Sequence, residues 1–214
     1  ADNTSTSFDP NTANKIVIAY RDGGNGNKGT AIVGTVSGTS ISFGSASVFC
    51  TSATSYISIS FDPNTANKFI VGGRATSGYA GVYVGTISGT SLSFGSQQNA
   101  STVESNYNAN KLACIWSNND SAARGEAVMG TVSGTSISFG TMAVFNSGAT
   151  AYLSLSFDAN TANKIVISYQ DSGNSNYGTA IVGTVSGTSI SFGSESVFNS
   201  ASTLSTSVSF DPSS

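Results

Sequence analysis

The sequence predicts an all-β protein, namely a four-bladed β-propeller whose blades each have four antiparallel strands. The first observation is an internal repeat. The pattern GT-V/I-SGTS-I/L-SFG begins at Gly34, Gly85, Gly130 and Gly183. The second is that apolar residues alternate with polar ones along short runs bounded by turn residues, which is typical of β-strands. A repeat of about 50 residues built from four such runs is characteristic of a propeller blade.

Each repeat contains four strand-like runs, which we call A to D. Run A is YISISFD at 56–62, run B is KIVIAY at 15–20, run C is TAIVGTV at 30–36 and run D is SISFGSASVF at 40–49. A Ser-Gly pair between C and D predicts a tight hairpin. Run B is apolar on both faces, as expected of a central strand between two neighbouring blades.

The turn between A and B carries the most repeated motif of the chain. SFDPNTANK occupies 7–15 and 60–68, and it returns at 156–164 with Ala159 in place of proline. Proline fixes φ, and Asp and Asn side chains cap chain reversals, so we interpret the motif as turn chemistry. The repeated Asp9, Asp62, Asp158 and Asp211 are accordingly expected to cap the turn rather than to form a ring of acids.

The predicted domain is a single propeller over 1–214, with repeats at approximately 1–50, 51–99, 100–147 and 148–200. Run A occurs a fifth time within 201–214, ending in SFDP. We interpret this segment as an extra inner strand that closes the ring, in competition with the first run A. The alternatives are a partial propeller cut from a longer array, a larger ring completed by two chains, and a β-sandwich or solenoid.

Composition and charge argue against several classes of function. The net charge is -3 with eight Lys and Arg residues, so no basic stripe for nucleic acid is expected. Membrane insertion is not expected either, since no apolar run approaches about 18 residues. Histidine is absent, which excludes Ser-His-Asp and Cys-His catalysis.

Cys50 and Cys114 are expected to be separate free thiols, with Cys114 behaving as a small buried hydrophobe. No signal peptide is visible, and the start at Ala1 suggests a processed chain or a fragment.

The B–C loops differ between repeats while the A–B and C–D turns are nearly constant, so we place the candidate ligand-binding residues at the ends of run B. Aromatic rings beside polar groups suit a sugar, because a ring stacks on its C–H face while the polar groups bind hydroxyls. The competing interpretation is that the rings cover the ends of the blade core. The candidate residues are Tyr20, Arg21, Asp22, Arg74, Trp116, Asn118, Tyr169, Gln170 and Asp171.

Two loops carry Asp and Asn at spacings that resemble a calcium loop or the Asp-box of sialidases. They are DGGNGNKG at 22–29 and DSGNSNYG at 171–178. They lack the second carboxylate and distal Glu of an EF-hand, so we interpret them as Gly/Asn turns capped by aspartate. No metal or other cofactor is expected, except for an ion in an axial channel by analogy with propellers that resemble hemopexin domains.

The stretch SFDPNTANKIVIAY with its following Gly/Asn loop resembles the blade pattern of YVTN-type propellers. The Ser/Thr/Gly-rich repeats also resemble propeller-like repeats in tail and adhesin-like proteins of marine phages and bacteria. This resemblance covers nearly the whole chain. It implies blade architecture and an extracellular or virion-associated location.

The sequence therefore predicts a non-enzymatic binding or structural module. Its expected partners are surface glycans or other structural proteins, in a phage tail, virion surface or secreted adhesin. One alternative is a propeller-fold glycan-processing enzyme. That enzyme would need converging carboxylates, whereas Glu104, Glu126 and Glu195 lie at unrelated positions of the repeat. A second alternative is an architectural spacer without a ligand.

Overall fold

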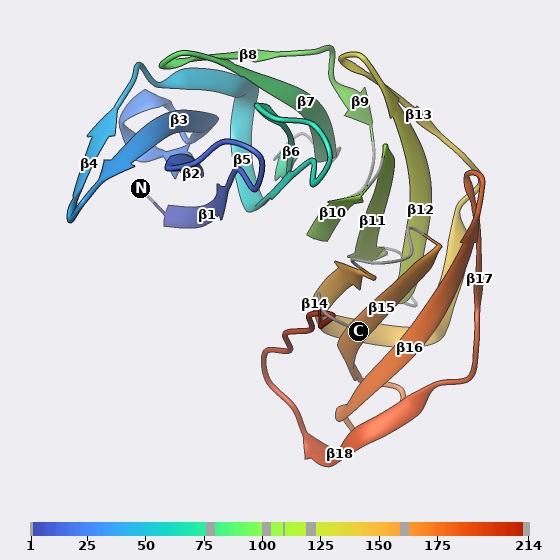
Figure 1. Ribbon diagram of the computed structural model, residues 1–214. Coiled ribbons are helices and arrows are strands. Elements are labelled where there is room, and N and C mark those ends of the chain that lie inside the picture. Colours follow the sequence, from blue (N-terminus) through green and yellow to red (C-terminus); the bar gives the residue numbers. More distant parts are fainter. Residues whose placement is uncertain are drawn as a thin grey trace. The chain divides into compact units, whose positions relative to one another are not determined.

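The computed structural model describes residues 2–75, 80–99, 104–108, 110–118, 123–158 and 163–211. These residues are almost entirely antiparallel β-strands and turns, which confirms the all-β prediction (Figure 1). Contacts divide the chain into two compact units. Unit 1 comprises 1–110 and 132–137, and unit 2 comprises 111–131 and 138–214. Each unit is described by itself.

The strands follow the predicted runs closely. The first two repeats contain β1 (Asp2–Phe8), β2 (Lys15–Asp22), β3 (Lys28–Ser37), β4 (Ser40–Phe43), β5 (Ser47–Phe61), β6 (Lys68–Ala75), β7 (Ala80–Ser88), β8 (Ser91–Phe94) and β9 (Gln98–Asn99). The remainder contains β10 (Glu104–Asn108), β11 (Lys111–Ser117), β12 (Arg124–Ser133), β13 (Ser136–Phe139), β14 (Ala143–Phe157), β15 (Lys164–Asp171), β16 (Tyr177–Ser186), β17 (Ser189–Phe192) and β18 (Ser196–Ser202).

Each repeat forms a small sheet in which run B lies in the middle. In the first repeat, β1 pairs with β2 and β2 with β3, and β3 then pairs with both β4 and the beginning of β5. The fourth repeat has the same order, from the end of β14 through β15 and β16 to β17 and β18. Run D is thus broken into two strands at Gly44 and at Gly193.

The separation of run D from the next run A was predicted wrongly. The structure joins them into single 15-residue strands, β5 and β14 (Figure 1). The first half of β5 pairs with β3 and the second half with β6, so one strand passes from one sheet to the next. Tyr56 and Tyr152 adopt left-handed φ values of 52° and 51°, and the register shifts around them. Each tyrosine therefore lies in a β-bulge, where the ladder is locally interrupted and the strand bends.

The A–B turn has the predicted chemistry. The Asp9 Oδ1 atom accepts the Asn11 amide at 2.8 Å, and Asp62 Oδ1 accepts the Asn64 amide at 2.9 Å. Asn14 and Asn67 end the turn at φ values of 64° and 63°, a conformation that asparagine tolerates better than most residues. The capping role of these aspartates is confirmed.

Aromatic and branched side chains fill the core of unit 1. Phe49 packs against Tyr83 and Phe94, with ring centroids 5.7 and 5.9 Å apart. Phe69 packs against Phe61 and Phe94 in the same cluster. Their contacts join run D of the first repeat to the second repeat, so neighbouring repeats share one core. Burial of such rings contributes the largest apolar area per residue.

Unit 2 repeats this arrangement with different partners. Phe145 lies 5.2 Å from Tyr169 and 5.9 Å from Phe192, between ring centroids. Cys114 is fully buried, and both Cys114 and Cys50 are free thiols, as predicted. Burial raises the pKa of the Cys114 thiol above its ordinary value of 9.0. No helix in the described part of the chain has the length and apolarity that crossing a membrane requires.

Candidate functional site

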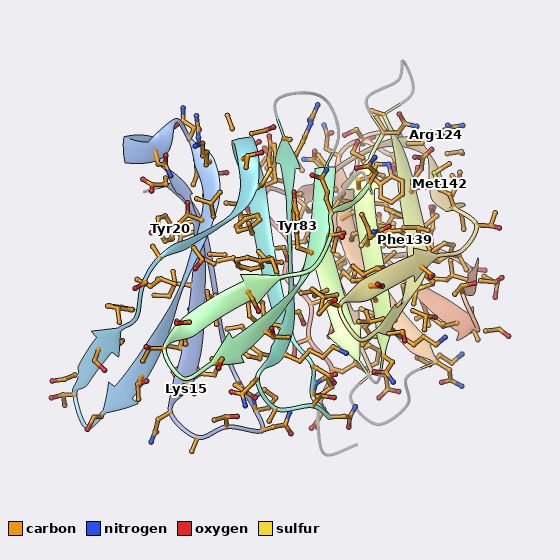
Figure 2. The ribbon with its side chains drawn as sticks, turned by 90° about the horizontal axis from the view of Figure 1, so that it is seen from above. Lys15, Tyr20, Tyr83, Arg124, Phe139 and Met142 are labelled. Atoms are coloured by element: carbon orange, nitrogen blue, oxygen red, sulfur yellow. The ribbon has the colours of Figure 1, made fainter. Side chains whose placement is uncertain are left out.

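The candidate residues lie where run B meets the B–C loop. Figure 2 shows Tyr20 and Lys15 at opposite ends of β2, with Lys15 beside the A–B turn. The predicted grouping of loops holds at both ends of the strands. Thr54 in the D–A strand donates its amide to the Asn27 carbonyl of the B–C loop at 2.9 Å. At the opposite end, Val36 donates to the Asn14 carbonyl at 2.9 Å.

Trp116 belongs to a buried polar network in unit 2. Its indole Nε1 donates to Glu126 Oε2 at 2.9 Å, while Asn118 Nδ2 donates to Glu126 Oε1 at 2.8 Å. Arg124 Nη2 lies 3.0 Å from the same Oε1 atom and forms an ion pair with it. The carboxylate of Glu126 is buried and receives charge-assisted hydrogen bonds from three side chains. The Trp116 side chain is 8% exposed and belongs to the buried core.

Glu126 and Arg124 were not among the predicted site residues. In the antiparallel register Trp116 lies directly opposite Glu126, and Arg124 directly precedes Gly125, the partner of Ser117. Cross-strand neighbours on one face are in contact distance of each other. The antiparallel pairing of runs B and C places Glu126 beside Trp116. This strand register is the signal by which Glu126 could have been found from the sequence.

Tyr169 is also buried and hydrogen-bonded. Its hydroxyl donates to Glu195 Oε1 at 2.9 Å, and Asn146 Nδ2 donates to the same Glu195 oxygen at 3.1 Å. Burial is the main cause that raises the pKa of Tyr169, and the adjacent Glu195 and Asp171 carboxylates raise it further. The ring packs on Phe145, so it too belongs to the buried core. Tyr20, its equivalent in the first repeat, is partly exposed.

The remaining candidates include loop caps and strand-end polar groups. Asp22 Oδ1 accepts the Gly24 amide at 3.0 Å, and Asp171 Oδ1 accepts the Gly173 amide at 3.0 Å. These bonds confirm the interpretation of both loops as capped Gly/Asn turns. Gln170 is buried and donates through Nε2 to the Thr203 carbonyl at 2.6 Å. Arg21 and Arg74 are partly buried on β2 and β6.

The structure therefore gathers the candidates into separate groups within the units. Unit 1 holds Tyr20, Arg21 and Asp22 along β2, with Arg74 on β6. Unit 2 holds the Trp116–Asn118–Glu126 network and, on β15, the stretch from Tyr169 to Asp171. Among the described residues, no group of three or more Cys, Asp or Glu side chains could hold a metal ion.

Comparisons with known proteins identify the fold. No protein-family model matches the chain, and neither does any curated protein. Among solved structures, TolB from Acinetobacter baumannii superposes with a TM-score of 0.52 at 14% identity, over 88% of this chain and 42% of TolB. Sqt1 from Chaetomium thermophilum superposes with a TM-score of 0.51 at 9% identity, over 86% of this chain and 57% of Sqt1.

Both of these solved structures are propellers, so the chain has a propeller-like all-β fold. It spans less than two thirds of the length of each of them. At these identities the likeness concerns architecture alone.

Proposed function

We propose that the protein is a non-enzymatic binding module that presents its B–C loops to a ligand. One observation carries the proposal. The two glutamates with described side chains, Glu126 in β12 and Glu195 between β17 and β18, are engaged in holding the fold. Glu126 binds three side chains, and Glu195 binds Tyr169 and Asn146. A general acid–base pair instead needs carboxyl groups that converge on a shared substrate position.

Two B–C loops, one in each unit, have the composition of a contact surface. Residues 23–26 and 172–176 are exposed and consist of Gly, Ser and Asn. The aspartate cap at the start of each loop fixes its conformation, which lowers the entropic cost of binding. Short amide and hydroxyl side chains on a loop with little charge suit a neutral polyhydroxy ligand. Surface glycans are therefore the ligand class we propose, in a phage tail, virion surface or secreted adhesin.

Exchange of one loop provides the sharpest test. Residues 23–27, GGNGN, are replaced by the equivalent SGNSN of residues 172–176, which keeps the aspartate cap and the loop length. Wild type and variant are compared on a glycan array, and titration calorimetry measures the hits. We expect wild-type binding that the exchange changes in affinity or selectivity. Flat responses across diverse glycans would reject the sugar ligand and favour an architectural spacer.

The enzymatic alternative is tested on the same preparations. Polysaccharide substrates are incubated with wild type and with the Asp22→Asn and Asp171→Asn variants. Asparagine keeps the acceptor oxygen of the cap while removing the charge. We expect no turnover by any of the three proteins. Turnover that disappears in one variant would contradict the proposed function.

A further inference from the structure

Neighbouring repeats pack through two distinct faces. The downstream face of a repeat is the one that carries Phe49 in the first repeat. The upstream face is the one that carries Phe94 in the second repeat. In unit 1 the downstream face of the first repeat covers the upstream face of the second. In unit 2 Phe145, the equivalent of Phe49, covers Tyr169 and Phe192 in the same way.

Among the described residues of unit 2, none covers the downstream face of the fourth repeat. Phe198, the equivalent of Phe49 and Phe145, is 57% exposed, whereas Phe49 is 6% exposed. On the same face Val182 is 46% exposed, whereas its equivalent Val33 is 1% exposed. The sequence of this face is that of a buried interface.

A glycine supports the same conclusion independently. A Cβ atom at Gly44, Gly95 or Gly140 would collide with the carbonyl oxygen of Thr90, Thr135 or Thr188, in the C–D hairpin of the following repeat. At Gly193, the fourth equivalent, the nearest heavy atom is 3.7 Å away and belongs to its own repeat. Gly193 thus keeps the residue type that admits a neighbouring hairpin, although no hairpin of the described residues contacts it.

The described residues of unit 1 likewise leave the upstream face of the first repeat uncovered. Phe8 is 58% exposed, whereas its equivalent Phe61 is 5% exposed. Ile41 and Phe43 on the same face are also exposed. Tyr20 is partly exposed, and its equivalent Tyr169 is buried by Phe145. Unit 2 by itself therefore carries an open downstream face, and unit 1 by itself carries an open upstream face of matching sequence.

We propose that a second copy of this chain docks its first repeat onto the fourth repeat, head to tail. The occupant follows from complementarity, because the contact reproduces the interface that already joins the first and second repeats and the third and fourth. Phe43 and Tyr20 of one copy pack on Phe198 and Val182 of the other, and the hairpin at Gly38 reaches Gly193. Such heterologous contacts close a ring or propagate, depending on the angle between copies.

The C-terminal segment specifies how the copies join. The Ile59 amide donates to Ser5 Oγ at 3.3 Å, from the second inner strand to the first. The Val208 amide donates to Ser154 Oγ at 3.2 Å, which is the equivalent bond from the fifth run A to the fourth. Residues 204–211 thus hold the inner-strand place of a next repeat, although they are not in a described strand. In the assembly they pair with β2 of the docked copy, and its β1 leaves that place.

The test measures association of the full-length chain by sedimentation velocity over a range of concentrations. We expect wild type to associate, and Gly193→Val and Phe198→Asp to abolish association with unchanged circular dichroism. Val197→Asp is the matched control, since Val197 and its equivalents Val48 and Val144 are all exposed. A wild type that stays monomeric at every concentration would overturn the proposal. Equal effects of Val197→Asp and Phe198→Asp would do the same.

Strand replacement has its own pair of variants. Val208→Pro removes an amide of the incoming strand, and Thr6→Pro removes the equivalent amide of β1. We expect Val208→Pro to weaken association at least tenfold and Thr6→Pro to leave it unchanged or to strengthen it. The opposite order would show that β1 keeps its place and would overturn the replacement. Closure of the repeats within one chain would appear as a monomer that Phe198→Asp destabilises, which contradicts the docking.

Discussion

The backbone amide of Asn67 donates to Asp9 Oδ2 at 2.7 Å, so the A–B turn of the second repeat is fastened to that of the first. The other oxygen of Asp9 caps its own turn through the Asn11 amide. Asn11 in turn donates through Nδ2 to the Asp62 carbonyl at 2.9 Å. The most repeated motif of the chain therefore does more than reverse the chain, because it also links successive repeats.

Replacing Asp9 removes the two hydrogen bonds that its carboxylate accepts, from the Asn11 and Asn67 amides. We expect Asp9→Ala to lower the free energy of unfolding by about 2 kcal/mol, since two part-buried hydrogen bonds lose their charged acceptor. Asp9→Asn keeps one acceptor oxygen and is expected to cost about half as much. Urea unfolding followed by circular dichroism measures both. A change below about 0.5 kcal/mol in Asp9→Ala would contradict the role of the link.

The network around Glu126 is expected to depend on its donors. Trp116→Phe keeps an aromatic ring but removes the N–H that binds Glu126 Oε2, and we expect a loss of about 1–2 kcal/mol. Glu126→Ala leaves three donors without their shared acceptor and is expected to cost about 3 kcal/mol or more. Thermal unfolding compares the two with wild type. An order in which Trp116→Phe is the more destabilising would show that ring packing outweighs the carboxylate.

Alkaline pH is expected to destabilise the fold through Cys114. Burial raises the pKa of this thiol above 9.0, so the unfolded chain loses the proton first as the pH rises. At pH values between the pKa of the unfolded chain and that of the native state, the native state binds more protons than the unfolded state. The free energy of unfolding therefore falls with increasing pH. Cys114→Val removes the titrating group at a position whose equivalents are Ile18 and Ile167. Urea unfolding at several pH values from 7 to 10 should show a shallower loss of unfolding free energy in the variant than in wild type. Identical slopes would show that Cys114 does not cause the pH dependence.

Gly85 is expected to tolerate no side chain. A Cβ atom there would overlap the ring of Phe69, which is fully buried in the unit 1 core. We expect Gly85→Ala to cost about 1–3 kcal/mol through overpacking. Gly23→Ala is the control, because the nearest atom to its Cβ would be 3.9 Å away in an exposed loop. Equal stability of the two variants in urea would contradict the close packing at Gly85.

The sequence by itself determined the strands and their turns. Periodicity located runs B and C within two residues of β2 and β3, because alternation and flanking Gly, Asn and Pro are local properties. The capping aspartates were predictable for the same reason, since Asp9 and Asp22 bind amides two residues away. The repeat length also indicated the propeller-like fold that TolB and Sqt1 share.

Only the tertiary structure decided how each side chain is used. Trp116 and Tyr169 were candidate ligand contacts by residue type, but Glu126, Glu195 and Phe145 bury them through cross-strand and inter-repeat contacts. The continuity of β5 from one sheet to the next also depends on its pairing with two different strands. Identical repeats differ in the end because burial depends on neighbours: Phe49 has a following repeat to cover it, and Phe198 has none among the described residues.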